Sequence, residues 1–220
     1  MEKETGMPNL PEMEHKILDF WDREQIFEKL KEQNKKTGKY FAFLDGPITA
    51  NNEMKLHHVW NRALKDIMLR FNALTGHDAH YQNGFDAQGL WVEVGVEKAL
   101  GLKDKKDVLN YGMDKFTEAC INRVNYYAGR ISEQSKRLGQ WMNWNDSYFT
   151  NSDTNITTIW YFLKKCYEKG WLIEKYRPMP WCSHCGTSLS EHELADSYQD
   201  LEHMAVFFKL PIKNTNNSII

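Results

Sequence analysis

The feature that most constrains this sequence is a short apolar run that ends abruptly in a loop and leads into a helix. Residues 40–44 (Tyr-Phe-Ala-Phe-Leu) are continuous and apolar, which is typical of a buried strand. The run ends at residues 45–47 (Asp-Gly-Pro), and an apolar stripe at helical spacing predicts a helix over about 57–72. A second short strand is predicted over about 80–86. Strand, loop, helix and strand in this order predict a parallel α/β sheet.

Helical periodicity predicts further helices over residues 12–35, 90–100, 114–138 and 154–169. The last of these helices has an N-cap candidate at Asp153 and ends at Gly170. Strand-like pieces follow at 171–176 and 206–210. Two strands with crossovers form half of a doubly wound sheet, and a complete nucleotide-binding sheet needs a second set of strands. The predicted fold class is therefore α/β, with the first half of a parallel sheet.

Composition excludes several classes of protein. The 220 residues are 41% hydrophobic, which is enough apolar material for a core. The 28 Lys and Arg residues against 30 Asp and Glu give a net charge of -2, which excludes a strongly basic nucleic-acid wrapper but not a local basic groove. The longest aliphatic or aromatic runs, among them residues 204–208, are too short to cross a bilayer, and the first residues contain no apolar signal core. We expect a cytoplasmic protein that does not enter a membrane.

The first chemical motif is the loop after residue 44 together with the start of the helix that follows it. A loop that leaves a strand and opens a helix presents free backbone N–H groups at the positive end of the helix dipole, which suits phosphate. Lys55, His57 and His58 lie at this helix start, where an imidazole donates hydrogen bonds to phosphate oxygens as charge develops. The spacing of these residues does not exclude the alternative, in which this segment is a surface loop with two incidental histidines.

The second motif is the acidic residue that follows the second predicted strand. Asp86 comes at the carboxyl end of that strand, where ligands of open α/β sheets bind, and its carboxylate could hold a cationic group. The alternative is that Asp86 is the N-cap of the next helix.

The third motif is a pair of cysteines. Cys182 and Cys185, followed by Gly186, place two thiolates on one tight turn, as tetrahedral zinc requires. No second Cys-x-x-Cys pair is present, so the motif is predicted to be half of a split site, although His184 and His192 are possible substitutes. A redox role is less favoured because no helical pattern begins at Cys182.

Together, the motifs resemble the N-terminal part of a class I isoleucyl-tRNA synthetase. The matching segments extend from the first helix through Leu210 and follow the family's order: Gly-Pro-x-Thr-Ala-Asn at 46–51, a variant His-x-x-His segment at 55–58, Gly-Phe-Asp-x-x-Gly-Leu at 84–90, Val-Glu-Lys-x-Leu-Gly at 96–101, and Cys-x-x-Cys-Gly-Thr-x-Leu-Ser-x-His-Glu at 182–193. The resemblance implies three parts. These are an N-terminal helical segment (1–38), the first half of a Rossmann-like nucleotide-binding catalytic domain (39–180), and a zinc knuckle that begins an inserted editing domain (181–220).

The resemblance also implies roles for individual residues. Residues 55–58 (Lys-Leu-His-His) take the place of the family's His-Ile-Gly-His signature, so the implied catalytic residues are Lys55, His57 and His58. The implied ATP-binding residues are Gly46, Pro47, Thr49, Asn51 and His58. The implied amino-acid-binding residues are Pro47, Asp86, which receives the α-ammonium, and Gln88. The implied zinc ligands are Cys182 and Cys185. The sequence departs from many members at Ile48, Gln88 and Trp91, and these departures affect the shape of the amino-acid pocket.

The implied reaction is attack of the isoleucine carboxylate on the α-phosphorus of ATP, with Mg²⁺ on the phosphates, followed by transfer of the acyl group to tRNA(Ile). The 220 residues lack the family's Lys-Met-Ser-Lys-Ser loop, so we expect a fragment that is inactive alone and a monomeric parent. Two alternatives are a fragment of a valyl- or leucyl-type synthetase and a non-catalytic module that binds zinc or tRNA. The stretch Gly-Leu-Trp-Val-Glu at 89–93 favours the isoleucyl branch.

Overall fold

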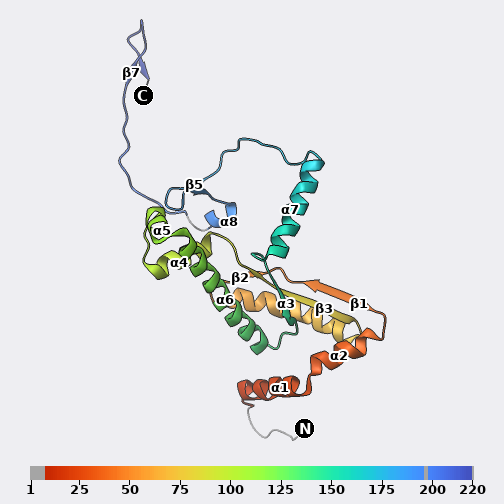
Figure 1. The fold of residues 1–220 in the computed structure, drawn as a ribbon. Coiled ribbons are helices and arrows are strands. Elements are labelled where there is room, and N and C mark those ends of the chain that lie inside the picture. The colour runs from red at the N-terminus through yellow and green to blue at the C-terminus, as the bar shows by residue number, and fades with distance from the viewer. Residues whose placement is uncertain (1–7, 196–197, 220) are drawn as a thin grey trace. The chain divides into compact units, whose positions relative to one another are not determined.

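The computed structural model describes residues 8–195 and 198–219, except for the side chain of His192. The chain divides after Lys175 into two compact units (Figure 1). None of the described helices has both the length and the apolar character that crossing a bilayer requires.

The first unit contains both helices and strands, and those that were predicted follow one another in the predicted order. Its elements are α1 (Leu10–Glu24), α2 (Ile26–Lys35), β1 (Tyr40–Leu44), β2 (Ile48–Thr49), α3 (Leu56–Leu74), β3 (Asp78–Asp86), α4 (Leu90–Leu100), α5 (Lys105–Tyr111), α6 (Met113–Arg137), β4 (Asn143–Phe149) and α7 (Asp153–Glu168). The second unit contains short elements only: β5 (Trp181–Cys182), β6 (Thr187–Ser188), α8 (Glu191–Leu194), β7 (Leu210–Pro211) and β8 (Ser218–Ile219).

The sheet of the first unit is parallel throughout, which confirms the predicted α/β class. β3 lies in the middle and pairs with β1, β2 and β4. The β1 register sets Tyr40 opposite Asp78, and β2 continues this alignment with Thr49 opposite Asp86. β4 joins β3 with Phe149 opposite Phe85. The carboxyl ends of β2, β3 and β4 therefore meet at one edge of the sheet.

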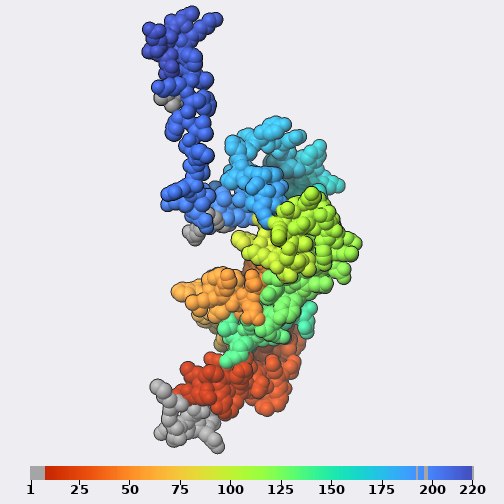
Figure 2. All heavy atoms as spheres, turned by 90° about the vertical axis from the view of Figure 1, so that its left-hand side faces the viewer, coloured from red at the N-terminus to blue at the C-terminus, as the bar shows by residue number. Residues whose placement is uncertain are grey.

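The core lies on one face of the sheet. Near the carboxyl ends of the strands, Phe85 packs with residues of α4 and α6, including Val92 and Ile131. Farther back along β3, Tyr81 packs with Leu69 of α3 and with aromatic side chains of α2 and β1. These helices cover the face to which alternate residues of β3 point. Figure 2 shows the atoms near the start of α3, in orange, standing out from the green atoms of α6.

Several local predictions differ from the structure. The helix predicted over 12–35 is broken at Gln25, which has a left-handed φ of 50°. β4 and α5 were not predicted. Ser152, rather than Asp153, is the N-cap of α7, because its side chain accepts from the Asn155 N–H. The segments predicted as strand-like at 171–176 and 206–210 are not strands, except that Leu210 begins β7.

Candidate functional site

The two predicted motifs meet at the carboxyl end of the sheet. Thr49, the last residue of β2, lies opposite Asp86 at the end of β3. The Ala50 N–H donates to the Asp86 carbonyl over 2.9 Å, and the Thr49 hydroxyl donates to Asp86 Oδ2 over 2.9 Å. Residues 37 positions apart are therefore in direct contact.

The loop begins at a buried acidic residue. The Asp45 side chain is fully buried and accepts a hydrogen bond of 2.6 Å from Lys65 of α3. Arg62 of the same helix, 1% exposed, lies 3.4 Å from the other carboxylate oxygen. Burial lowers the pKa of Arg62, and the facing Asp45 carboxylate opposes that shift. The Tyr148 hydroxyl donates to the Asp45 carbonyl over 2.6 Å, so α3 and β4 fix the start of the loop together.

The predicted ATP-binding residues Gly46 and Pro47 follow this anchor. The Gly46 carbonyl accepts from Lys65 over 3.3 Å, which ties the peptide after Asp45 to α3. Gly46 is exposed, whereas Pro47 and Thr49 are partly buried.

Helix α6 holds the middle of the loop. Arg123 donates to the Asn51 side chain over 2.5 Å and to its carbonyl over 2.9 Å. The Asn51 amide donates in turn to the Trp91 carbonyl over 2.7 Å. About three turns farther along α6, Gln134 accepts from the Met54 N–H over 2.9 Å. Asn51, predicted to bind ATP, therefore has both ends of its side chain in contacts that hold the loop.

The start of α3 carries Lys55, His57 and His58. The N–H groups of His58 and Val59 donate to the Lys55 carbonyl, and within the described residues the earlier N–H groups of Leu56 and His57 have no backbone acceptor. Free N–H groups at the positive end of a 19-residue helix attract an anion.

The structure fixes the hydrogen-bonding role of the His58 ring. The Lys55 N–H donates to His58 Nδ1 over 3.1 Å, so Nδ1 is an acceptor. In the neutral ring the proton is then on Nε2, which is left as a donor. Partial burial lowers the pKa of His58, and the neighbouring cationic groups His57, Lys55 and Arg62 lower it further. His58 is therefore a neutral N–H donor at neutral pH. His57 is exposed, and its ring centroid lies 4.0 Å from that of His58.

The Asp86 carboxylate is held by neutral donors. Thr49 binds Oδ2, while the Thr150 hydroxyl lies 3.3 Å from Oδ1 and the Gln88 N–H lies 3.4 Å from Oδ1. Helix α4 has Gly89 as its N-cap, so the alternative in which Asp86 caps the next helix is wrong. Gln88 is exposed, and its side-chain amide reaches the Thr150 carbonyl over 3.5 Å.

The two cysteines lie in the second unit. Cys182 ends β5, and a tight turn leads to β6, with the Cys185 N–H 3.4 Å from the Cys182 sulfur. This N–H lowers the pKa of Cys182, which favours the thiolate. Across residues 8–195 and 198–219, no group of three or more His, Cys, Asp or Glu side chains lies close enough together to hold a metal ion. The side chain of His192 is outside the described residues, so the turn as described supplies two sulfur ligands.

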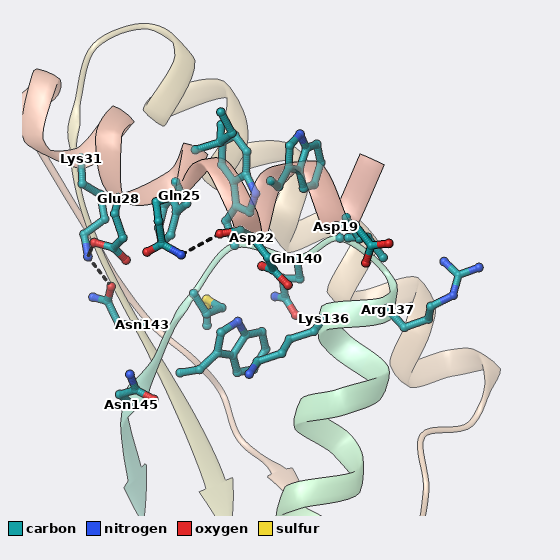
Figure 3. Close-up of a pocket in the computed structure, with 18 of the residues that line it drawn as sticks. Asp19, Asp22, Gln25, Glu28, Lys31, Lys136, Arg137, Gln140, Asn143 and Asn145 are labelled. Atoms are coloured by element: carbon teal, nitrogen blue, oxygen red, sulfur yellow. Dashed lines mark hydrogen bonds and ion pairs between the residues drawn. The ribbon is translucent and has the colours of Figure 1, made fainter. Parts of the chain in front are cut away.

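A cavity of about 800 Å³ lies elsewhere in the first unit, between α1, α2 and the start of β4 (Figure 3). Lys31 donates to Asn143 at its edge over 2.8 Å. None of the predicted site residues lines this cavity. It surrounds the amino end of β4, whereas the predicted site lies at the carboxyl ends of the strands.

Sequence reasoning missed the residues that hold the site in place. Arg123, Lys65 and Thr150 each contact a loop or strand end from a distant part of the chain, and Thr150 lies 64 positions from Asp86. No pattern within a short sequence window links such positions, because the pairing of β3 with β4 brings Thr150 to Asp86.

Comparison with known proteins gives consistent matches. Residues 16–209 match the family model described as tRNA synthetases class I (I, L, M and V). The isoleucine–tRNA ligase of Cutibacterium acnes is 39% identical over 93% of this chain and 18% of its own length. Those of Pyrococcus horikoshii and Thermus thermophilus are 38% and 37% identical over 94% and 97% of this chain, and 20% of their own lengths. The chain thus spans about a fifth of the length of these curated relatives.

Proposed function

Because this chain belongs to the class I tRNA synthetases of the isoleucine, leucine, methionine and valine group, we propose that it supplies the first half of an isoleucine–tRNA ligase active site. The proposed reaction joins isoleucine to ATP as an aminoacyl-adenylate and transfers the acyl group to tRNA(Ile). The relatives compared above are all named isoleucine–tRNA ligases, which favours isoleucine over valine or leucine.

One observation carries the proposal: the contact between Thr49 and Asp86 brings the phosphate loop and an acidic side chain to one end of the sheet. The start of α3 supplies N–H donors for phosphate, and Asp86, which pairs with Thr49 seven positions before Leu56, supplies an acceptor for an ammonium group. Attack of a carboxylate on a phosphate requires these two substrates side by side, so positioning is the main contribution of these residues.

In the proposed mechanism His58 acts on the phosphate. Its Nε2–H donates to ATP oxygens that gain charge as the α-phosphorus is attacked, and its Nδ1 is held by the Lys55 N–H throughout. The Mg²⁺ that accompanies ATP as part of the substrate would supply neutralisation of phosphate charge. Lys55 adds a flexible positive charge that attracts phosphate but lacks the geometry of an imidazole.

The test is isoleucine-dependent pyrophosphate exchange in the full-length protein as encoded. His58→Ala should slow the exchange at least about tenfold more than Lys55→Ala does, because one transition-state donor is worth about 10²–10³ in rate. His57→Ala should fall between them or be mild. The affinity for ATP should change little, because the donor strengthens in the transition state.

Thermal unfolding of the same variants is the control, since His58→Ala also removes the acceptor for the Lys55 N–H. Exchange with valine, leucine and methionine tests the choice of amino acid. An exchange rate for His58→Ala within about threefold of the wild type would mean that the phosphate-site assignment is wrong.

We propose further that Cys182 and Cys185 are half of a structural zinc site. Two thiolates on one turn are too few for tight binding, so the isolated chain should hold zinc weakly or share it between two chains. Zinc content after a chelator wash measures this, with Cys185→Ser as the control variant. Stoichiometric zinc on a monomer would instead show that His184 or His192 completes the site.

The same proposal places the protein in the cytoplasm, where its RNA, amino-acid and nucleotide substrates are dissolved. We also propose that the whole protein is a monomer; the phosphate loop and the ammonium site come from one chain, so the proposed site needs no second copy.

A further inference from the structure

Thr150 lies directly after β4, beside the acidic residue of the site. The parallel register sets Phe149 opposite Phe85, and the Thr150 N–H donates to the Phe85 carbonyl over 3.1 Å. Thr150, which follows Phe149 at the end of β4, therefore lies beside Asp86, which follows Phe85 at the end of β3.

Every polar group of Thr150 is engaged. Its hydroxyl accepts from the Ala87 N–H over 2.8 Å, which leaves the hydroxyl proton for Asp86 Oδ1 at 3.3 Å. Its carbonyl accepts from the Asn155 side chain over 2.9 Å and from Gln88 over 3.5 Å. A hydroxyl anchored in this way has one direction in which to donate.

The Asp86 carboxylate thus accepts hydrogen bonds from two threonine hydroxyls, one at each oxygen. Thr49 donates to Oδ2 and Thr150 donates to Oδ1, from opposite sides of β3. Among the described residues no Lys, Arg or His forms an ion pair with this partly buried carboxylate. Oδ2 has a single donor and keeps a lone pair for another. A negative charge that is fixed in orientation and lacks a cationic partner is suited to a primary ammonium.

We propose that Thr150 is a positioning residue for the amino-acid substrate: its hydroxyl fixes the Asp86 carboxylate in the orientation that receives the α-ammonium. This inference rests on the proposed function and adds to it a residue that does not itself touch the substrate. Loss of the hydroxyl leaves Asp86 in place but holds its carboxylate less firmly, because Thr49 and the long contact from the Gln88 N–H then remain as its only donors among the described residues. The loss should therefore appear in recognition of the ammonium and not in recognition of ATP.

The test compares Thr150→Val with Thr150→Ser in the full-length protein. The valine variant keeps the shape of the side chain and removes the hydroxyl, so the KM for isoleucine in pyrophosphate exchange should rise about tenfold. The KM for ATP should stay within about twofold. The serine variant retains the hydroxyl and should restore the KM for isoleucine to within about twofold of the wild type.

Two inhibitors separate this role from a general loosening of the fold. Isoleucinol keeps the ammonium and lacks the carboxylate, so its inhibition constant should rise in Thr150→Val as much as the KM for isoleucine does. The acid 3-methylpentanoate keeps the side chain and carboxylate but lacks the ammonium, and its inhibition constant should not change. Thr49→Val, which removes the donor to Asp86 Oδ2, should show the same difference between these two inhibitors, and this comparison does not depend on its KM for ATP. It keeps the test decisive if Thr150→Val folds poorly.

Equal weakening of both inhibitors, or an unchanged KM for isoleucine in both valine variants, would overturn the positioning role while leaving the proposed function intact. A wild-type protein that shows no isoleucine-dependent exchange would overturn the proposed function and this inference with it.

Discussion

At the scale of single residues, Gly84 shows how closely the site is packed. A Cβ at this position of β3 would lie 2.3 Å from ring carbons of Tyr148, whose hydroxyl holds the Asp45 carbonyl. Gly84→Ala should therefore displace the ring and destabilise the protein by about 1–3 kcal/mol. The midpoint of urea unfolding measures this change.

Gly129 of α6 is the matched control, because a Cβ there meets nothing within 4 Å. Gly129→Ala should stabilise the protein by about 0.5–1 kcal/mol through its helical preference. If Gly84→Ala unfolds at the wild-type midpoint, the ring of Tyr148 does not press on β3. Adding Tyr148→Ala should remove most of the penalty of Gly84→Ala.

Tyr81 should make the stability depend on alkaline pH. Its side chain is fully buried and donates to the Leu69 carbonyl over 2.5 Å, and burial raises the pKa of Tyr81 to about 12 from an ordinary 10.0. Below pH 10 the folded and unfolded states both keep the proton. Between about pH 10 and 12 only the unfolded state loses it, so this residue's contribution to stability falls as pH rises.

Urea unfolding at pH 9 and pH 11 should therefore show a smaller loss of stability in Tyr81→Phe than in the wild type. Other tyrosines and lysines titrate in both proteins, so the difference between the two proteins isolates Tyr81. Equal losses in the two proteins would contradict the raised pKa.

At the scale of elements, β1, α3, β3, α4, α6 and α7 were predictable, because each carries a regular apolar pattern between clear breakers. The break at Gln25 was not, because glutamine is not a usual left-handed residue. The break is held locally by the Gln25 N–H and side-chain amide, which both donate to the Asp22 carbonyl and close α1. The apolar stripe continues across Gln25, so helical periodicity alone predicts a single helix.

The strands show that a local sequence pattern does not decide which segments pair into a sheet. β4 has the polar sequence Asn-Trp-Asn-Asp-Ser-Tyr-Phe and becomes a strand because β3 offers it a parallel partner. The more apolar segment 171–176 has no such partner among the described residues and is not a strand. Strand formation depends on pairing between distant segments, which a local pattern does not report.

The same limit applies to the candidate site. Asp86, the loop and the histidines could be found because they follow predicted strands or begin a predicted helix. Their supports could not, because Arg123 contacts Asn51 across 72 positions and Tyr148 contacts Asp45 across 103. The catalytic and binding roles of the predicted residues themselves stay predictions.

At the scale of the whole molecule, the sheet of the first unit has one covered face and one open face. Tyr40 and Leu44 of β1, each 64% exposed, belong to the open face, as does the exposed His80 of β3. β1 is also an edge strand, since within the described residues it pairs with β3 alone. Parallel sheets are normally covered on both faces, so an open face is unusual, and at β1 it exposes two large apolar side chains to water.

A second apolar surface runs along α3. Large side chains at helical spacing on this helix are more than half exposed: Leu56, Trp60, Leu64, Ile67, Phe71 and Leu74. The opposite side of α3 carries the buried Arg62 and Leu69. The helix is thus buried along one side and apolar along its exposed side, which is typical of a helix that lies between two layers.

We therefore expect the isolated 220-residue chain to self-associate. An exposed apolar edge strand templates pairing with another chain, and the α3 surface adds apolar area that water disfavours. Light scattering on a size-exclusion column should show oligomers whose mass grows with concentration. Tyr40→Lys with Leu44→Lys should shift the chain toward monomer, because charges on an edge strand oppose pairing.

The control is Leu109→Lys, at a residue of α5 that is 60% exposed and away from both surfaces, and it should leave association unchanged. A monodisperse wild-type monomer with a sharp thermal transition would show that neither surface drives association.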